Sequence, residues 1–213
     1  MTKSTASIIL LLLSLLPSTV AARTVGDLFA SEPGKIFVLL TRTNRLDMVD
    51  YHLNGQNVAI SNLEDGDSRL VDMDSTWLKV QSSASKTVEM RMMVNGRDTV
   101  VALIETVLTP TPDSRITFWN AQWQPVKAGK VFKTPELDDF ILKSMSADMR
   151  DELSVLMPFP FIEMHFSGER HDGLEAVFKA KESIGPGQYM RFAPYIKETL
   201  NYRINGVKIK TVK

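Results

Sequence analysis

Four residues near the middle of the chain have side chains of the kinds that often dominate a binding surface. Asp113 and Arg115 are followed closely by Trp119 and Trp123. Tryptophan and arginine are enriched at the energetic centres of protein interfaces, so these four are the candidate binding residues of the sequence. A structural alternative explains them equally simply: the tryptophans would close one end of a core, and Asp113 would pair with Arg115 in a turn.

No arrangement of residues in the sequence indicates catalysis, and we predict no catalytic residues. The chain has no cysteine and no Gly-x-Ser-x-Gly motif that would present a nucleophilic serine. A structural role suits His52, which lies beside the apolar face of a predicted helix. His165 and His171 could meet across a hairpin and bind a metal ion, but their spacing matches no known ligand pattern. The sequence therefore predicts neither a metal site nor a cofactor.

An acidic run over residues 64–67, Glu-Asp-Gly-Asp, is the other motif that could hold an ion. Calcium needs about six to eight oxygen ligands from a shaped loop. If the glycine took its place in such a loop, Ser61 and Leu63 would stand where acids are needed. An Asp-Gly turn between two strands explains the run more simply. Asp72 and Asp74 leave open a weak ion site at the surface.

Length, composition and charge describe a folded protein that does not resemble a nucleic-acid binder. The chain has 213 residues, of which 25 are basic and 25 acidic, and 44% are hydrophobic. This length suits one domain or two small ones, and the apolar fraction is sufficient for a core. A formal charge of zero differs from the basic character of most proteins that bind nucleic acid.

Residues 1–22 have the pattern of a secretory signal peptide. Lys3 precedes the apolar run Ile8–Leu16, and Ser18–Ala22 offers small residues at the cleavage position. A membrane-spanning helix needs about 20 apolar residues, so this run is too short to cross a bilayer. A buried N-terminal helix is the alternative. We therefore predict an exported protein.

The remainder of the chain, residues 23–213, is predicted to be a single domain without a transmembrane segment. It has no cysteine to accept a lipid anchor and no Asn-x-Ser/Thr site for glycosylation. A chain of about 190 residues can bury enough surface to fold without disulfides. These features favour a periplasmic or envelope-associated bacterial protein, whose partner would be an unknown envelope protein or ligand.

An antiparallel meander over residues 76–126 must position the four candidate binding residues. Its centre is Asn95-Gly96, a pair typical of a two-residue type I′ turn, which would place Met92 opposite Thr99. The arm over residues 99–108 is almost entirely apolar, as expected for a strand that is covered on both faces. The meander is therefore predicted to be the centre of the fold.

Helices are predicted before and after the meander from capping residues and from the spacing of apolar side chains. They begin near Thr24, Ser31, Thr43, Thr134 and Ser146. In the third of them, which ends near Leu53, Leu46 and Val49 would face the core together with Leu53. Arg45 would face solvent.

Two hairpins complete the chain, one over residues 161–180 and one about Asn205-Gly206. The order of helices, meander, helices and hairpins predicts an α+β fold with a mainly antiparallel sheet packed against short helices. Each half runs from helices to strands. Two similar halves with a break near residues 127–134 therefore remain an open alternative to a single unit.

Short motifs occur along most of the predicted mature chain. They are Thr24–Phe29, Pro33, Leu39–Thr41, Asn44-Arg45, Pro112–Ile116, Thr134-Pro135, Asp138–Phe140, Pro194-Tyr195, Leu200 and Tyr202-Arg203. Together they resemble an uncharacterised family of exported proteins, a domain of unknown function, from Bacteroides and its relatives. The resemblance implies a signal peptide and a Gram-negative envelope location. It implies no activity and no catalytic residues.

These observations favour one function and leave two others open. The preferred prediction is a non-enzymatic binding or protein-interaction module of the envelope, because export and an extensive sheet occur without a catalytic motif. The first alternative is an envelope hydrolase that uses two carboxylates in one open pocket. The second is a carrier of lipophilic molecules, with an apolar cavity between the sheet and the helices.

Overall fold

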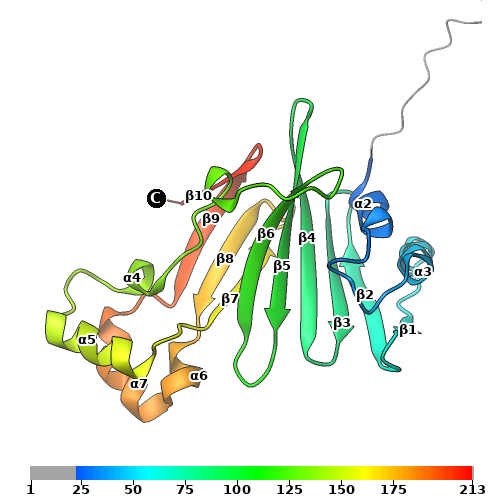
Figure 1. The fold of residues 1–213 in the computed structure, drawn as a ribbon. Helices are drawn as coiled ribbons and strands as arrows, with labels where there is room; N and C mark the ends of the chain where they lie inside the picture. Colours follow the sequence, from blue (N-terminus) through cyan, green and yellow to red (C-terminus); the bar gives the residue numbers. More distant parts are fainter. Residues whose placement is uncertain (1–22, 213) are drawn as a thin grey trace, which may run out of the picture.

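The structure, a computed structural model, describes residues 23–212 and contains two antiparallel sheets. Figure 1 shows the first sheet, β1–β6, in cyan and green, with the second sheet, β7–β10, beside it in yellow to red. The predicted α+β fold, built from a meander and hairpins with short helices, is confirmed. The predicted signal peptide lies outside the described residues.

The elements follow the predicted order of helices, meander, helices and hairpins. The helices are α2 (Val25–Ser31), α3 (Arg42–Leu53), α4 (Leu137–Phe140), α5 (Ala147–Leu156), α6 (Ala180–Ile184) and α7 (Pro186–Phe192), with 3-10 turns η2 (Ala128–Lys130) and η3 (Ala193–Tyr195). The first sheet contains β1 (Ala59–Ser61), β2 (Asp67–Met73), β3 (Trp77–Ser83), β4 (Lys86–Asn95), β5 (Asp98–Val107) and β6 (Asp113–Asn120). The second contains β7 (Ile162–Ser167), β8 (Gly173–Phe178), β9 (Thr199–Asn205) and β10 (Lys208–Thr211). No helix within residues 23–212 has the length and apolar composition of a membrane span.

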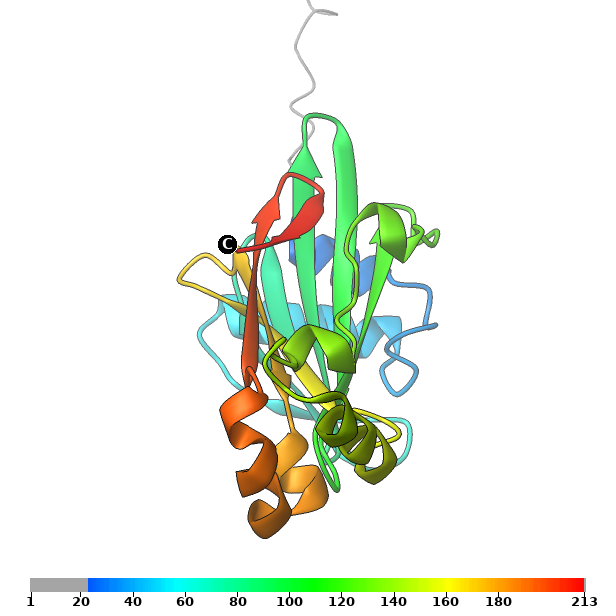
Figure 2. The ribbon, with the colours of Figure 1, turned by 90° about the vertical axis from the view of Figure 1, so that its left-hand side faces the viewer.

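The central strands of the first sheet are buried on both faces, as the apolar sequence of β5 predicts. Val101 and Leu103 of β5 point to the core formed with α2 and α3. Ala102 and Ile104 point to the core formed with the second sheet. Figure 2 shows the green strands between the blue helices and the red strands of β9 and β10. The first sheet therefore separates two hydrophobic cores.

The β4–β5 hairpin forms at the predicted place, but its turn lies one residue later. Asn95 pairs with Asp98, so the two turn residues are Gly96 and Arg97. Of these two, Gly96 has a positive φ of 62°. A positive φ at the first turn residue alone is characteristic of a type II′ turn, so the predicted type I′ turn is wrong. Asn95 can stay in the strand because this turn needs a positive φ only at its first position, and Gly96 occupies that position.

This change moves each cross-strand pair by two residues and keeps every side chain on its predicted face. Met92 lies opposite Val101, where the sequence predicted Thr99. The hairpin of β9 and β10 has the same arrangement, since Asn205 pairs with Lys208 and Gly206 has a positive φ of 59°.

Replacing Gly96 with valine is expected to lower the free energy of unfolding by about 1–3 kcal/mol, because a β-branched residue would be held at positive φ. A Cβ at Gly96 would meet no atom within 4 Å, so the expected cost comes from the backbone conformation. Gly129 also has open space around it and no positive φ, which makes Gly129→Val the matched control. Urea denaturation measures both variants. Equal, small losses would show that the backbone at Gly96 imposes no strain.

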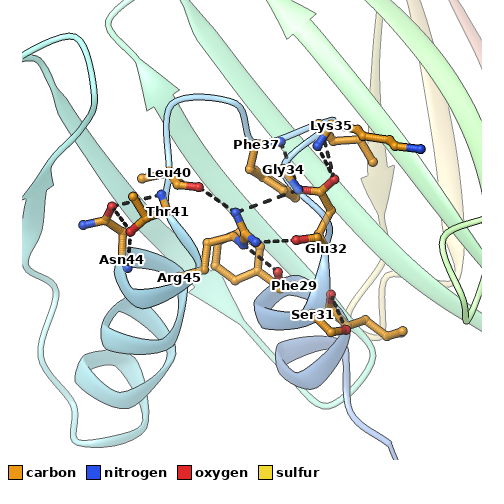
Figure 3. Close-up of polar contacts among 12 residues, drawn as sticks. Phe29, Ser31, Glu32, Gly34, Lys35, Phe37, Leu40, Thr41, Asn44 and Arg45 are labelled. Carbon is orange, nitrogen blue, oxygen red and sulfur yellow. Dashed lines mark hydrogen bonds and ion pairs between the residues drawn. The ribbon is translucent and has the colours of Figure 1, made fainter.

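The first and third predicted helices form, but the second is a loop. Thr24 is the predicted N-cap of the first, whereas the third is capped by Thr41, two residues before its predicted start. Thr24 and Thr41 accept hydrogen bonds from the backbone N–H groups of Asp27 and Asn44. The chain after Ser31 does not turn into a helix. The carboxylate of Glu32 instead accepts hydrogen bonds from the backbone N–H groups of Gly34 and Lys35, which Figure 3 shows, and from that of Ile36. These bonds curl the chain around the carboxylate.

Helix α3 turns a different side to the core from the one predicted. Arg45 and Met48 are buried, each 2% exposed, while Leu46 and Leu53 are 43% and 72% exposed. The prediction was wrong because the charge of Arg45 was taken as a sign of exposure. In the fold, that side chain has enough backbone partners to be buried.

The first of the mid-chain helices is shorter than its sequence signal suggests, whereas the second forms in full. The helix predicted from Thr134 begins at Leu137, after Glu136 as the N-cap, and α4 then has four residues. Helix α5 follows Ser146 as predicted, and the Ser146 hydroxyl accepts a hydrogen bond from the N–H of Met149.

Candidate functional site

The four candidate binding residues lie at two separate places on β6 and the turn after it. Asp113 begins β6, whereas Trp119 is near its end and Trp123 follows it. Trp119 is six positions after Asp113 along an extended strand, a distance of roughly 20 Å. The structure therefore does not gather Asp113, Arg115, Trp119 and Trp123 into one site.

Asp113 and Arg115 have different surroundings. One carboxylate oxygen of Asp113 accepts a hydrogen bond of 3.0 Å from the N–H of Ile162, so Asp113 connects β6 to β7. Arg115 is exposed and lies opposite Glu105 on β5. Within residues 23–212, no ion pair joins Asp113 to Arg115.

The two tryptophans pack against each other at the other end of β6. Their ring centroids are 6.3 Å apart, and Trp123 is 6% exposed with a positive φ of 59°. Trp123 belongs to the core under α2 and α3. The pair therefore closes one end of that core.

The histidines that could have met across the β7–β8 hairpin do not do so. The Nε2 atom of His165 lies 3.4 Å from Oε2 of Glu175, its neighbour on β8. The Nδ1 atom of His171 lies 3.2 Å from Oδ2 of Asp74, which follows β2 in the other sheet. In the part of the chain that the structure describes, no three His, Asp or Glu side chains are grouped as metal ligands.

A cleft with a volume of about 470 Å³ lies between helix α3 and the β2–β3 turn. We call it the α3 cleft. Its lining residues are Thr24, Gly26, Val49, His52, Leu53, Met73, Asp74 and Ser75. A cleft of this size, with apolar walls and a few polar groups, is typical of sites that bind small molecules. The α3 cleft is therefore our candidate functional site.

Helix α3 and the end of β2 position the lining residues. Val49, His52 and Leu53 share one side of α3, since residues three and four apart are neighbours on a helix. The Nε2 atom of His52 lies 3.1 Å from the carbonyl oxygen of Met73. A neutral His52 ring must therefore carry its hydrogen on Nε2, which leaves Nδ1 as an acceptor.

Asp74 supplies the negative charge at the edge of this cleft. Its Oδ1 accepts hydrogen bonds from the N–H groups of Thr76 and Trp77, the second at 2.7 Å. Burial by itself raises the pKa of Asp74. The hydrogen bonds from Thr76, Trp77 and His171 outweigh that effect and lower the pKa below its ordinary value. The carboxylate is therefore ionised at neutral pH.

Residues from both sheets hold Asp74 in place. The His171 ring stacks on Trp77 with centroids 3.7 Å apart and planes inclined by 7°. Arg91 donates a hydrogen bond to the hydroxyl of Thr76. Burial lowers the pKa of Arg91, while Asp74 and Asp172 raise it. The carboxylate at the cleft therefore also links the β2–β3 turn to the β7–β8 turn.

Sequence reasoning did not identify this cleft. It assigned His52 a structural role and considered Asp74 only for a weak ion site. The two residues lie in different elements, and α3 brings them together only by packing on β2. No local motif signals that contact.

Comparison with known proteins finds similar ones over most of the chain. The family described as "Protein of unknown function (DUF3256)" matches residues 18–208. A solved structure of a domain of an uncharacterized protein from Porphyromonas gingivalis W83 is similar with a TM-score of 0.74 and 20% sequence identity. The similarity covers 89% of this chain and 98% of that one, and it shows a shared fold. No protein with a curated description matches.

Proposed function

Because this chain belongs to the DUF3256 family, whose function is unknown, we propose a function from the geometry of the α3 cleft. The protein is an exported, non-enzymatic binding protein of the cell envelope, and its ligand is a small amphiphilic molecule. The observation that carries this proposal is the lining of the cleft, where apolar side chains stand beside an ionised carboxylate and a histidine. Export is supported by the signal-peptide pattern of residues 1–22.

The lining defines the chemistry of the ligand. Its apolar part would contact Val49, Leu53 and Met73. Its polar head would donate a hydrogen bond to Nδ1 of His52. The negative charge of Asp74 favours a neutral or cationic head and disfavours an anionic one. An alkyl amine or alcohol satisfies these requirements, and an alkyl carboxylate does not.

Replacing Leu53 with aspartate is expected to weaken binding of octanol at least tenfold, because an apolar wall of the cleft becomes charged. Leu53 is 72% exposed, so the substitution leaves the core intact. Saturable rises in melting temperature with octylamine, octanol and octanoate measure the affinities. The wild-type protein should respond to the first two and not to the third.

Leu63→Asp is the matched control, since Leu63 is 64% exposed in a turn away from the α3 cleft. It should bind octanol as the wild-type protein does. Equal binding of octanol by the Leu53→Asp variant, or no saturable response to octanol or octylamine in the wild-type protein, would rule out this site.

The other two predicted functions have less support. Asp113 and Glu136 line one cleft, which is the feature that a carboxylate hydrolase requires, but Asp113 also holds the backbone of Ile162. A lipophilic carrier would need space between the helices and the first sheet. Between α2 and the first sheet, Leu28 and Phe29 are fully buried and belong to the hydrophobic core. This packing gives the carrier function no support.

A further inference from the structure

A second cleft, of about 480 Å³, lies between β6, α4 and the segment that leads from α5 into β7. We call it the α4–α5 groove. Its lining is mainly apolar, with Met157, Ile162 and Met164 among its residues, and two carboxylates, Asp113 and Glu136, also line it. None of the described residues that line it is a lysine or arginine.

Two large apolar side chains that are next in the chain to residues lining the α4–α5 groove are exposed. Val155 is 81% exposed and Phe159 is 80% exposed, whereas Met157, which lies between them in the chain, lines the groove. Pro158 and Pro160 flank Phe159 and restrict its backbone. An apolar surface that adjoins a groove and is held rigidly is characteristic of an interaction site.

The charge around the α4–α5 groove determines what can bind it. Residues 133–160 contain six acidic and three basic residues, although the whole chain is balanced. Three of the acids form ion pairs, Asp138 with Arg150 at 2.8 Å, Asp139 with Lys133 at 3.9 Å and Glu152 with Arg191 at 2.6 Å. The other charged residues of this range are Glu136, Asp148, Asp151 and Lys143, so an excess of negative charge remains. Arg115 is two residues from Asp113 on β6 but does not line the groove. A cationic group is therefore the electrostatic complement.

We infer that the α4–α5 groove binds an extended peptide segment of an exported partner that carries both basic and apolar side chains. A lysine or arginine of the segment lies against Glu136. Apolar side chains of the segment cover Phe159 and Val155, which lie outside the groove and would stay exposed around a small amine. The inference is independent of the α3 cleft.

The experiment uses residues 23–213 and two fluorescent five-residue peptides, one alternating leucine with lysine and one alternating leucine with glutamate. Fluorescence polarisation at low salt measures binding. The lysine peptide is expected to bind saturably and at least tenfold more tightly than the glutamate peptide. Equal binding of the two peptides, or no binding of either, overturns the inference.

Variants of exposed residues locate the binding. Glu136→Lys is expected to weaken binding of the lysine peptide at least tenfold, and Phe159→Ser at least threefold, while Glu64→Lys in the distant β1–β2 turn leaves it unchanged. An effect of Glu64→Lys as large as that of Glu136→Lys would show non-specific attraction and overturn the site. If the Phe159→Ser variant bound the lysine peptide as tightly as the wild-type protein does, the proposed site would also be wrong. Leu53→Asp should bind the peptide normally, which separates this test from that of the α3 cleft.

Discussion

Replacing Arg45 with alanine is expected to lower the free energy of unfolding by about 3–5 kcal/mol, the usual cost of breaking a buried ion pair. Arg45 is 2% exposed and donates hydrogen bonds to the carbonyl oxygens of Phe29, at 2.9 Å, and Leu40, at 2.6 Å. It also donates to the carbonyl of Glu32 (Figure 3). Three chain segments therefore depend on one guanidinium group.

The cost is large because Glu32 would stay buried without its counter-ion. The side chain of Glu32 is fully buried, and its Oε2 lies 3.9 Å from Nη1 of Arg45. Burial lowers the pKa of Arg45, and the Glu32 carboxylate raises it. Since the carboxylate also organises the loop after α2, removing Arg45 affects the attachment of both N-terminal helices.

Urea denaturation of the Arg45→Ala variant measures this effect. Arg42→Ala is the matched control, because Arg42 lies on the same helix and is exposed. That control should stay within about 0.5 kcal/mol of the wild-type protein. A loss below about 1 kcal/mol in Arg45→Ala would show that the loop is held by its backbone contacts alone.

Replacing Glu89 with alanine is expected to lower the free energy of unfolding by about 3 kcal/mol, because it leaves buried donors without acceptors. Glu89 is 5% exposed. Its carboxylate accepts hydrogen bonds from Nζ of Lys79 at 3.0 Å, Nε1 of Trp77 at 3.3 Å and the N–H of Phe166 at 3.0 Å. The last of these bonds joins the two sheets.

Glu89 is one of three side chains that accept hydrogen bonds from backbone N–H groups at the edge of β7. The N–H groups of Ile162, Met164 and Phe166 point to the first sheet, where Asp113, Ser114 and Glu89 accept their hydrogen bonds. Side chains thus take the place of a neighbouring strand at this edge. The loss of Glu89 should therefore weaken the junction of the sheets as well as global stability.

Hydrogen exchange of the Phe166 amide reports on the junction, and urea denaturation reports on global stability. Glu105→Ala is the control, since Glu105 is a strand glutamate paired with Lys86 at 2.6 Å but is partly exposed. Its loss should cost no more than about 1 kcal/mol. If Phe166 stays protected in Glu89→Ala, then packing and the hydrogen bonds to Asp113 and Ser114 hold β7 in place without Glu89.

The sequence determined the features of this protein that depend on neighbouring residues. Thr24 and Ser146 start helices because their hydroxyl groups reach N–H groups three residues on. Gly96 places a hairpin turn because it accepts positive φ. The predicted turn type was nevertheless wrong. A type II′ turn needs a positive φ at its first position only, and Gly96 supplies it without Asn95.

Only the tertiary structure decided which charged residues are buried and which residues meet. Arg45 was predicted to face solvent, yet the backbone carbonyls of Phe29 in α2 and of Leu40 before α3 make its burial favourable. Asp113 was predicted as a binding residue, and its contact with Ile162 depends on how the second sheet meets the first. The α3 cleft likewise exists only where α3 packs on β2. Such contacts join residues far apart in the chain, and local patterns carry no information about the packing that pairs them.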